Sequence, residues 1–125
     1  MATLVIIEGQ SQGSQFKLTV PLISVGREET CTFQVLDDEV SRKHLQLKLD
    51  PATGRHSAGD YRSANGVFVN DKRIDHDVLL ADGDQIRIGR TKMMYLTEDH
   101  PDAKAAFAAA VKKGEWKRGT IMKRG

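Results

Sequence analysis

The sequence predicts an all-β fold, a sandwich or barrel of mainly antiparallel strands with a short helix at its C-terminal end. Apolar and polar residues alternate in short runs, which places one set of side chains in a core and the other in water, as in half-buried strands. Turn-forming residues separate these runs, and no helical period interrupts them before Glu98. With 125 residues, the chain has the length of one domain with a sizeable core.

The expected strands follow one another along the chain as far as residue 96. Strict alternation of apolar and polar side chains marks residues 16–20, 45–49 and 85–88. Shorter apolar runs predict further strands at residues 4–7, 23–25, 33–35, 67–69 and 93–96. Gly, Asn, Asp and Pro mark the turns between them, at residues 9–13, 37–38, 50–54, 65–66, 70–71 and 82–84.

A change of composition near Glu98 predicts two parts, a β-domain over residues 1–98 and a helix with a basic flexible tail over residues 99–125. Residues 1–97 hold 12 Lys and Arg against 13 Asp and Glu, a net charge of −1, whereas residues 98–125 hold 7 against 4, a net charge of +3. Acids and a proline favour a helix start near residue 101, and Lys112-Lys113-Gly114 favours a helix end. We therefore expect a helix that ends near Lys113 and a mobile segment beyond it.

Composition and motifs argue against several classes of protein. The single cysteine, Cys31, excludes an internal disulfide framework and a zinc site built from several cysteines. The longest apolar run, residues 105–111, is far shorter than the roughly 18 residues that cross a membrane, and the N-terminus lacks the basic start of a secretory signal. No phosphate-binding loop or dinucleotide fingerprint occurs. We expect a cytoplasmic protein that is not an enzyme and that has no cofactor and no metal.

Polar residues at the ends of the expected strands carry the chemistry of this sequence. Gly26-Arg27 closes one strand, Ser41-Arg42-Lys43-His44 precedes the next alternating run, and Ser63-Ala64-Asn65-Gly66 forms a turn. If these segments meet at one end of a sandwich, a charged arginine guanidinium, a serine hydroxyl and oriented backbone N–H groups lie together. Those are the groups that a phosphate binds.

These motifs, in this order, resemble the forkhead-associated (FHA) domain family. The family pattern runs Gly-Arg, Ser-x-x-His and Ser/Thr-x-Asn-Gly, and the sequence has these residues at 26–27, 41–44 and 63–66. The resemblance covers residues 2–97 and implies a β-sandwich of about eleven strands. It also implies that loops at one end recognise phosphothreonine in a partner protein, such as a Ser/Thr kinase or its substrate.

The resemblance implies roles for individual residues at this end. Arg27 and Ser41 are expected to hold the phosphate, and Arg42 is expected to contact the phosphate or the peptide backbone. Asn65 is expected to bond to the peptide backbone beside the phosphothreonine, and Ser63 is a further candidate for binding the phosphopeptide. Taken alone, each fits a plain structural role, such as a turn cap at Ser41 or an ion pair between Arg27 and a neighbouring glutamate.

Three residues are expected to shape the site rather than to contact the ligand. Gly26 lets the chain turn so that Arg27 points outward, and Gly66 permits the tight turn that follows Asn65. His44 is expected to brace the loop that carries Ser41.

One position departs from the family pattern. The residue before Asn65 is often a Thr or Ser that supplies a further hydroxyl to the phosphate, and here it is Ala64. Loss of a hydrogen bond to a charged group weakens binding by about tenfold or more unless another group compensates, and Ser63, Arg62 and Lys43 are the candidates. The alternative function is a protein-interaction module of the same fold that does not require phosphate.

The loops beside the expected site are acidic, which predicts basic residues next to the partner's phosphothreonine because unlike charges attract. The acids concerned are Glu28, Glu29, Asp37, Asp38 and Glu39. An ordinary solvated loop explains them equally well.

The basic C-terminal residues suggest two further hypotheses. Residues 111–125 hold six Lys and Arg against one Glu, which attracts any polyanion weakly, but no base-reading helix or aromatic platform accompanies them. We therefore do not expect a nucleic-acid-binding protein. Thr120 follows basic residues two and three positions earlier, so it is a candidate phosphosite for self-association by docking into its own sandwich or a neighbour's. An unstructured terminus is the alternative.

Overall fold

The computed structural model describes residues 2–98 and 100–122, with side chains described as far as Gly114. This part of the chain contains eleven strands and one helix. The strands are β1 (Thr3–Glu8), β2 (Gln15–Lys17), β3 (Leu22–Gly26), β4 (Phe33–Gln34), β5 (Leu45–Leu49), β6 (His56–Asp60), β7 (Val67–Val69), β8 (Lys72–Arg73), β9 (Val78–Leu79), β10 (Gln85–Ile88) and β11 (Thr91–Leu96). The helix α1 spans Ala103–Met122.

The strands form two sheets that pack face to face. One sheet has the order β2-β1-β11-β10-β7-β8 and the other has the order β4-β3-β5-β6-β9. β3 and β4 pair in parallel, and the other neighbouring strands pair antiparallel. The predicted β-sandwich is therefore confirmed, with the eleven strands that the family resemblance implied.

The alternation of side chains along the strands accounts for the core between the sheets. Leu45 and Leu47 of β5 are fully buried in it, whereas Gln46 between them is half-buried and Lys48 is exposed. Ile86 and Ile88 of β10 enter the same core from the other sheet. Burial of one large aliphatic side chain stabilises a fold by about 1.5–3 kcal/mol, so these residues hold the two sheets together.

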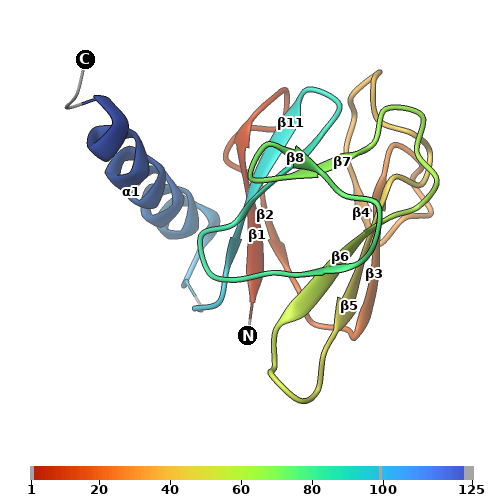
Figure 1. Ribbon diagram of the computed structural model, residues 1–125, viewed down its shortest axis with the longest axis horizontal. Coiled ribbons are helices and arrows are strands. Elements are labelled where there is room, and N and C mark those ends of the chain that lie inside the picture. The colour runs from red at the N-terminus through yellow and green to blue at the C-terminus, as the bar shows by residue number, and fades with distance from the viewer. Residues whose placement is uncertain (1, 99, 123–125) are drawn as a thin grey trace.

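The helix α1 forms a third layer on the outer face of the six-stranded sheet (Figure 1). Its small residues Ala106 and Ala110 are buried together with Val5 of β1 and with Met94 and Leu96 of β11. These three strand residues alternate with core residues along their strands, so they point away from the main core. The helix therefore closes a second, smaller apolar cluster.

The two ends of α1 differ in how well the sequence predicts them. At the start, the Asp102 side chain accepts a 2.8 Å hydrogen bond from the Ala105 N–H, which is an ordinary N-cap. At the other end, α1 continues to Met122, beyond the expected end near Lys113, and the flexibility of the segment after Lys113 stays a prediction. Gly114 does not have the positive φ of a glycine that ends a helix, and the helical backbone passes through it.

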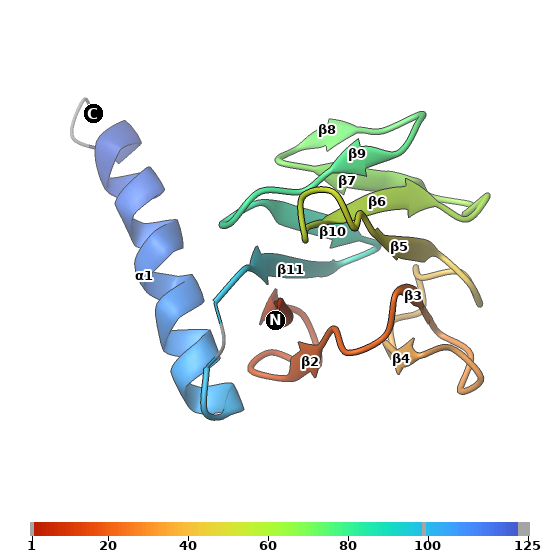
Figure 2. The ribbon, with the colours of Figure 1, turned by 90° about the horizontal axis from the view of Figure 1, so that it is seen from below.

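The sandwich gathers three connecting loops at one end. The loops that follow β3, β4 and β6 lie on the side of the molecule away from α1 in both Figure 1 and Figure 2. These are the loops that contain the residues of the family pattern. The fold thus separates the helix from the candidate site.

Candidate functional site

The loops after β3, β4 and β6 meet through direct hydrogen bonds. The Arg27 N–H donates to the Ser41 carbonyl at 3.0 Å, and the Glu28 N–H donates to the Arg42 carbonyl at 3.1 Å. The loop after β6 joins the other two through its side chains and through the Ala64 N–H. We call the surface that these loops form the rim, and it consists of the exposed residues Arg27, Arg42, Ala64 and Asn65 and the half-buried Ser41.

Gly26 allows the first two loops to approach this closely. A Cβ atom at this position would lie 2.1 Å from the Arg42 carbonyl oxygen, a separation that atoms in proteins do not adopt. The backbone of Gly26 does not have a positive φ, so the close approach, rather than the turn we expected, requires glycine here.

His44 links the Ser41 loop to the turn at Gly66. Its ring is fully buried, and its Nδ1 accepts a 2.9 Å hydrogen bond from the Ser41 N–H. Because Nδ1 is an acceptor in this bond, Nε2 carries the ring hydrogen and donates it to the Gly66 carbonyl at 2.7 Å. One side chain therefore fixes the relative position of two loops of the rim.

Two further contacts fix polar groups of the rim while leaving part of each free. The Ser41 hydroxyl oxygen accepts a 3.0 Å hydrogen bond from the Ala64 N–H, so its hydrogen remains available to a ligand. The Asn65 side-chain NH₂ donates to the Glu39 carbonyl at 2.8 Å, which leaves its oxygen available as an acceptor. Both side chains are thus held in place before any ligand binds.

Arg27 and Arg42 bring uncompensated positive charge to the rim. The Arg27 Nε donates to the Val40 carbonyl at 3.0 Å, which leaves the two terminal nitrogens for a ligand. Both arginines are exposed, and neither has an ion pair with a described carboxylate, Glu28 and Glu29 included. An exposed guanidinium fork without a carboxylate partner is well suited to two phosphate oxygens.

Ser63 and Gly66 build the turn that presents Asn65. The Ser63 N–H donates to the Asp60 carboxylate at 2.8 Å, and the Ser63 hydroxyl oxygen accepts from the Gly66 N–H at 2.9 Å. Gly66 has a φ of 84°, in the left-handed region that favours glycine. The structure thus places Ser63 within the turn rather than on the rim.

Arg73 is the residue of this region that the sequence reasoning missed. A Cβ atom at Gly66 would lie 2.7 Å from the Arg73 Nε, so the guanidinium rests directly against the Gly66 backbone, next to Asn65. Arg73 is exposed and has no carboxylate partner among the described side chains. β7 leads away from Gly66, and β8 runs back antiparallel to it with Arg73 opposite Phe68, which brings Arg73 close to the rim.

The acids beside the rim are partly engaged within the protein. Glu39 forms an ion pair with Arg90, and Asp37 accepts hydrogen bonds from the Thr91 hydroxyl at 2.8 Å and the Arg90 N–H at 2.9 Å. Burial acts to raise the pKa of Asp37, but these bonds, one from the Glu39 N–H and the charge of Arg90 together lower it below its usual value. These two acids hold the loop after β4 against the turn between β10 and β11.

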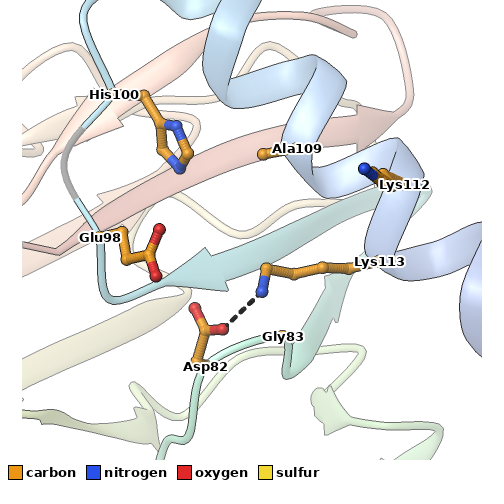
Figure 3. A pocket seen from close by; sticks show the side chains of 7 residues that line it. All are labelled: Asp82, Gly83, Glu98, His100, Ala109, Lys112 and Lys113. Carbon is orange, nitrogen blue, oxygen red and sulfur yellow. Dashed lines mark hydrogen bonds and ion pairs between the residues drawn. The ribbon is translucent and has the colours of Figure 1, made fainter.

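A hollow of about 470 Å³ lies between α1 and the sandwich, away from the rim (Figure 3). Lys113 of α1 reaches across it to the Asp82 carboxylate at 2.7 Å. Burial acts to raise the pKa of Asp82, but hydrogen bonds from Lys113 and Thr97 and the Lys113 charge lower it below its usual value. The pair therefore fastens the helix to the loop before β10.

Three other predictions concern groups outside the rim. Thr120 belongs to α1, but its side chain lies outside the described residues, so its phosphorylation stays a hypothesis. Among the described side chains, no three His, Cys, Asp or Glu residues gather as ligands for a metal ion. Within the described residues, α1 lacks the continuous apolar length with which a helix crosses a bilayer.

Comparisons with known proteins show the family of this chain. A family model described as FHA domain matches residues 23–89, which is more than half of the chain. The glycogen accumulation regulator GarA of Mycolicibacterium smegmatis is 36% identical over 101 residues, a match that covers 81% of this chain and 62% of that protein. The chain therefore spans less than two thirds of the length of this relative.

Two solved structures share the fold. One, from a study of phosphothreonine-dependent FHA domain interactions, has a TM-score of 0.69 and 28% identity and covers 79% of this chain and 98% of its own. The other is the FHA domain of FhaA in complex with the intracellular domain of Rv3910, with a TM-score of 0.67, 29% identity and coverage of 76% and 99%.

Proposed function

Because this chain belongs to the FHA domain family, we propose that it is a non-catalytic module that binds phosphothreonine in a partner protein at its rim. The observation that carries the proposal is the position of Arg27, Ser41 and Asn65 on three loops that His44 and backbone hydrogen bonds tie together. The similar structures support it, since one comes from work on phosphothreonine-dependent interactions and the other contains a protein partner.

Each group of the rim has a chemical task in this proposal. The terminal nitrogens of Arg27 donate charge-assisted hydrogen bonds to two phosphate oxygens, and the Ser41 hydroxyl donates its free hydrogen to a third. Arg42 adds a second positive charge beside the phosphate. The Asn65 side-chain amide hydrogen-bonds to the backbone of the bound peptide. This contact positions the phosphothreonine but does not select the side chains on either side of it.

The partner in this proposal is a protein with a phosphorylated threonine in an exposed, extended segment. A Ser/Thr kinase or one of its substrates carries such a segment. Four of the five rim residues are exposed and Ser41 is half-buried, so the rim suits a peptide chain that lies across it better than a small metabolite enclosed in a pocket. The name of the similar GarA protein, a regulator, is consistent with a role in signalling.

The test is a binding titration with phosphothreonine, phosphoserine and unphosphorylated versions of a peptide library. A hydrogen bond to a charged group contributes about 1.5–3 kcal/mol, so Arg27→Ala should weaken phosphothreonine binding by about tenfold to a hundredfold. Lys48→Ala is the matched control, because Lys48 lies on β5 in an ion pair with Asp77, outside the rim. Binding that is equal in Arg27→Ala and in the wild type would contradict the proposal.

A second candidate is a protein-interaction module of the same fold that does not require phosphate. Ala64 favours it, because this position has no hydroxyl and contributes only its N–H, which is bonded to Ser41. Ser63 lies in the turn, where its hydroxyl oxygen accepts from the Gly66 N–H, and only its hydrogen is left as a donor. Equal affinity for phosphorylated and unphosphorylated peptides in the same titration would favour this candidate.

A further inference from the structure

A row of side chains crosses the outer face of the six-stranded sheet beside the rim. Residues that lie directly opposite each other on paired strands share one face of the sheet. We call the aligned set the outer row, and from β8 to β1 it consists of Arg73, Phe68, Arg87, Lys92 and Glu8.

The half of the outer row on β8, β7 and β10 is positively charged and aromatic. The Arg87 guanidinium carbon lies 4.1 Å from the centroid of the Phe68 ring, in a cation–π contact. Lys92 is neutralised by Glu8 at 3.2 Å, but Arg87 and Arg73 have no carboxylate partner among the described side chains. The Arg87 guanidinium also donates one hydrogen bond to the Gly89 carbonyl at 3.3 Å, so its remaining N–H groups and the Arg73 guanidinium are the donors left for a ligand's carboxylates.

The helix α1 leaves this half of the row open. Its buried contacts on the same face are with Val5, Met94 and Leu96, which occupy the part of the face farther from the rim. Arg73 is exposed, and Phe68 and Arg87 are half-buried. The row is thus accessible to a partner, whereas the apolar remainder of the face is covered.

The outer row is continuous with the rim. Arg73 lies against the Gly66 backbone, next to Asn65, which we assign to the bound peptide. Neighbouring strands are about 4.8 Å apart, so Arg87, two strands from Arg73, is about 10 Å farther along the row. An extended peptide advances about 3.3 Å per residue and covers that distance in roughly three residues.

We propose that the outer row binds an acidic segment of the partner, close in sequence to its phosphothreonine. The inference rests on the proposed function of the rim. The carboxylates of this segment pair with the guanidinium groups of Arg73 and Arg87, and the cation–π contact with Phe68 holds the Arg87 guanidinium in place. The proposal differs from the expectation of basic flanks, because two of the five acids beside the rim, Asp37 and Glu39, are engaged within the protein, whereas Arg73 and Arg87 have no carboxylate partner among the described side chains.

The experiment compares peptides that share one phosphothreonine core. One is short, two carry three Glu residues on either the N-terminal or the C-terminal side of the core, and two carry three Gln residues at the same places. Each exposed ion pair strengthens binding up to about fivefold, and the row offers two arginines. The Glu extension on the side that faces the row should therefore tighten wild-type binding about three- to twentyfold, and the Gln extensions should not. The gain should shrink as the salt concentration rises.

Variants of the row assign that gain to its residues. Arg87→Gln and Arg73→Gln should each lose much of the gain from the Glu extension, with their melting temperatures verifying the fold. Arg87→Gln should keep the short-peptide affinity, because Arg87 lies outside the rim. Lys48→Gln, which removes one charge on the other sheet, should keep the full gain.

The outcomes separate the two proposals. If Glu and Gln extensions bind alike, or if the gain persists in both arginine variants, the acidic-segment proposal is overturned while binding at the rim stands. If the short phosphothreonine peptide does not bind the wild-type protein, the proposed function fails and the inference fails with it.

Discussion

Replacement of His44 by phenylalanine should destabilise the fold, because the buried ring makes two hydrogen bonds that a phenyl ring cannot make. The Ser41 N–H loses an acceptor at 2.9 Å, and the Gly66 carbonyl loses a donor at 2.7 Å. A buried polar group without a partner costs about 1–3 kcal/mol, and the Ser41 N–H is only part-buried, so the loss of both bonds in His44→Phe should lower the free energy of unfolding by about 2–5 kcal/mol. At roughly 4 °C per kcal/mol for a chain of this length, the melting temperature should fall by about 8–20 °C.

Urea and thermal unfolding followed by circular dichroism measure this effect. His76→Phe is the matched control, because the His76 side chain is 78% exposed and contacts only Asp75 among the ion pairs of the described residues. Such surface changes usually alter the free energy of unfolding by no more than about 0.5 kcal/mol. A loss that small for His44→Phe would refute the reasoning that the ring holds the two loops together.

Two further predictions concern Gly26 and the attachment of α1. Gly26→Ala should destabilise the fold by about 2 kcal/mol or more, because its Cβ would lie 2.1 Å from the Arg42 carbonyl oxygen, and a thermal melt equal to that of the wild type would disprove the close approach. Lys113→Ala should cost less than about 1 kcal/mol, since the Lys113 and Asp82 side chains are 38% and 34% exposed and water screens the pair. The lowered pKa of Asp82 means that its contribution is complete above the unfolded-state pKa, near 4, and is lost as the pH falls through the folded-state value. Urea titrations at a series of pH values should therefore show a weaker acid dependence in Lys113→Ala, and an unchanged profile would contradict the role of the pair.

The parts of the fold that the sequence predicted are those governed by local patterns. Leu45 and Leu47 alternate with polar residues, and such alternation specifies a strand and its buried face without knowledge of the rest of the chain. The ordered motifs at residues 26–27, 41–44 and 63–66 indicated which loops would meet, although each motif alone has an ordinary structural explanation.

The parts that the sequence did not predict depend on strand register and on contacts between distant segments. Arg73 reaches Gly66 because the hairpin of β7 and β8 pairs Phe68 with Arg73, and no local pattern states that register. The packing of Gly26 against the Arg42 carbonyl is likewise visible only once the two loops are placed. Gly114 carried a helix-end signal that depends on a left-handed backbone, which this glycine does not adopt.

The cross-loop hydrogen bonds of the rim bear on the entropy of binding. When a ligand immobilises mobile loops, the entropy that the loops lose weakens its binding. Here the backbone of Arg27 and the side chains of Ser41 and Asn65 are each held by a bond to another loop, and His44 spans two of them. That conformational freedom is lost when the chain folds, before any ligand arrives. The rim is thus a preorganised template, and the ordering cost of association falls mainly on the peptide.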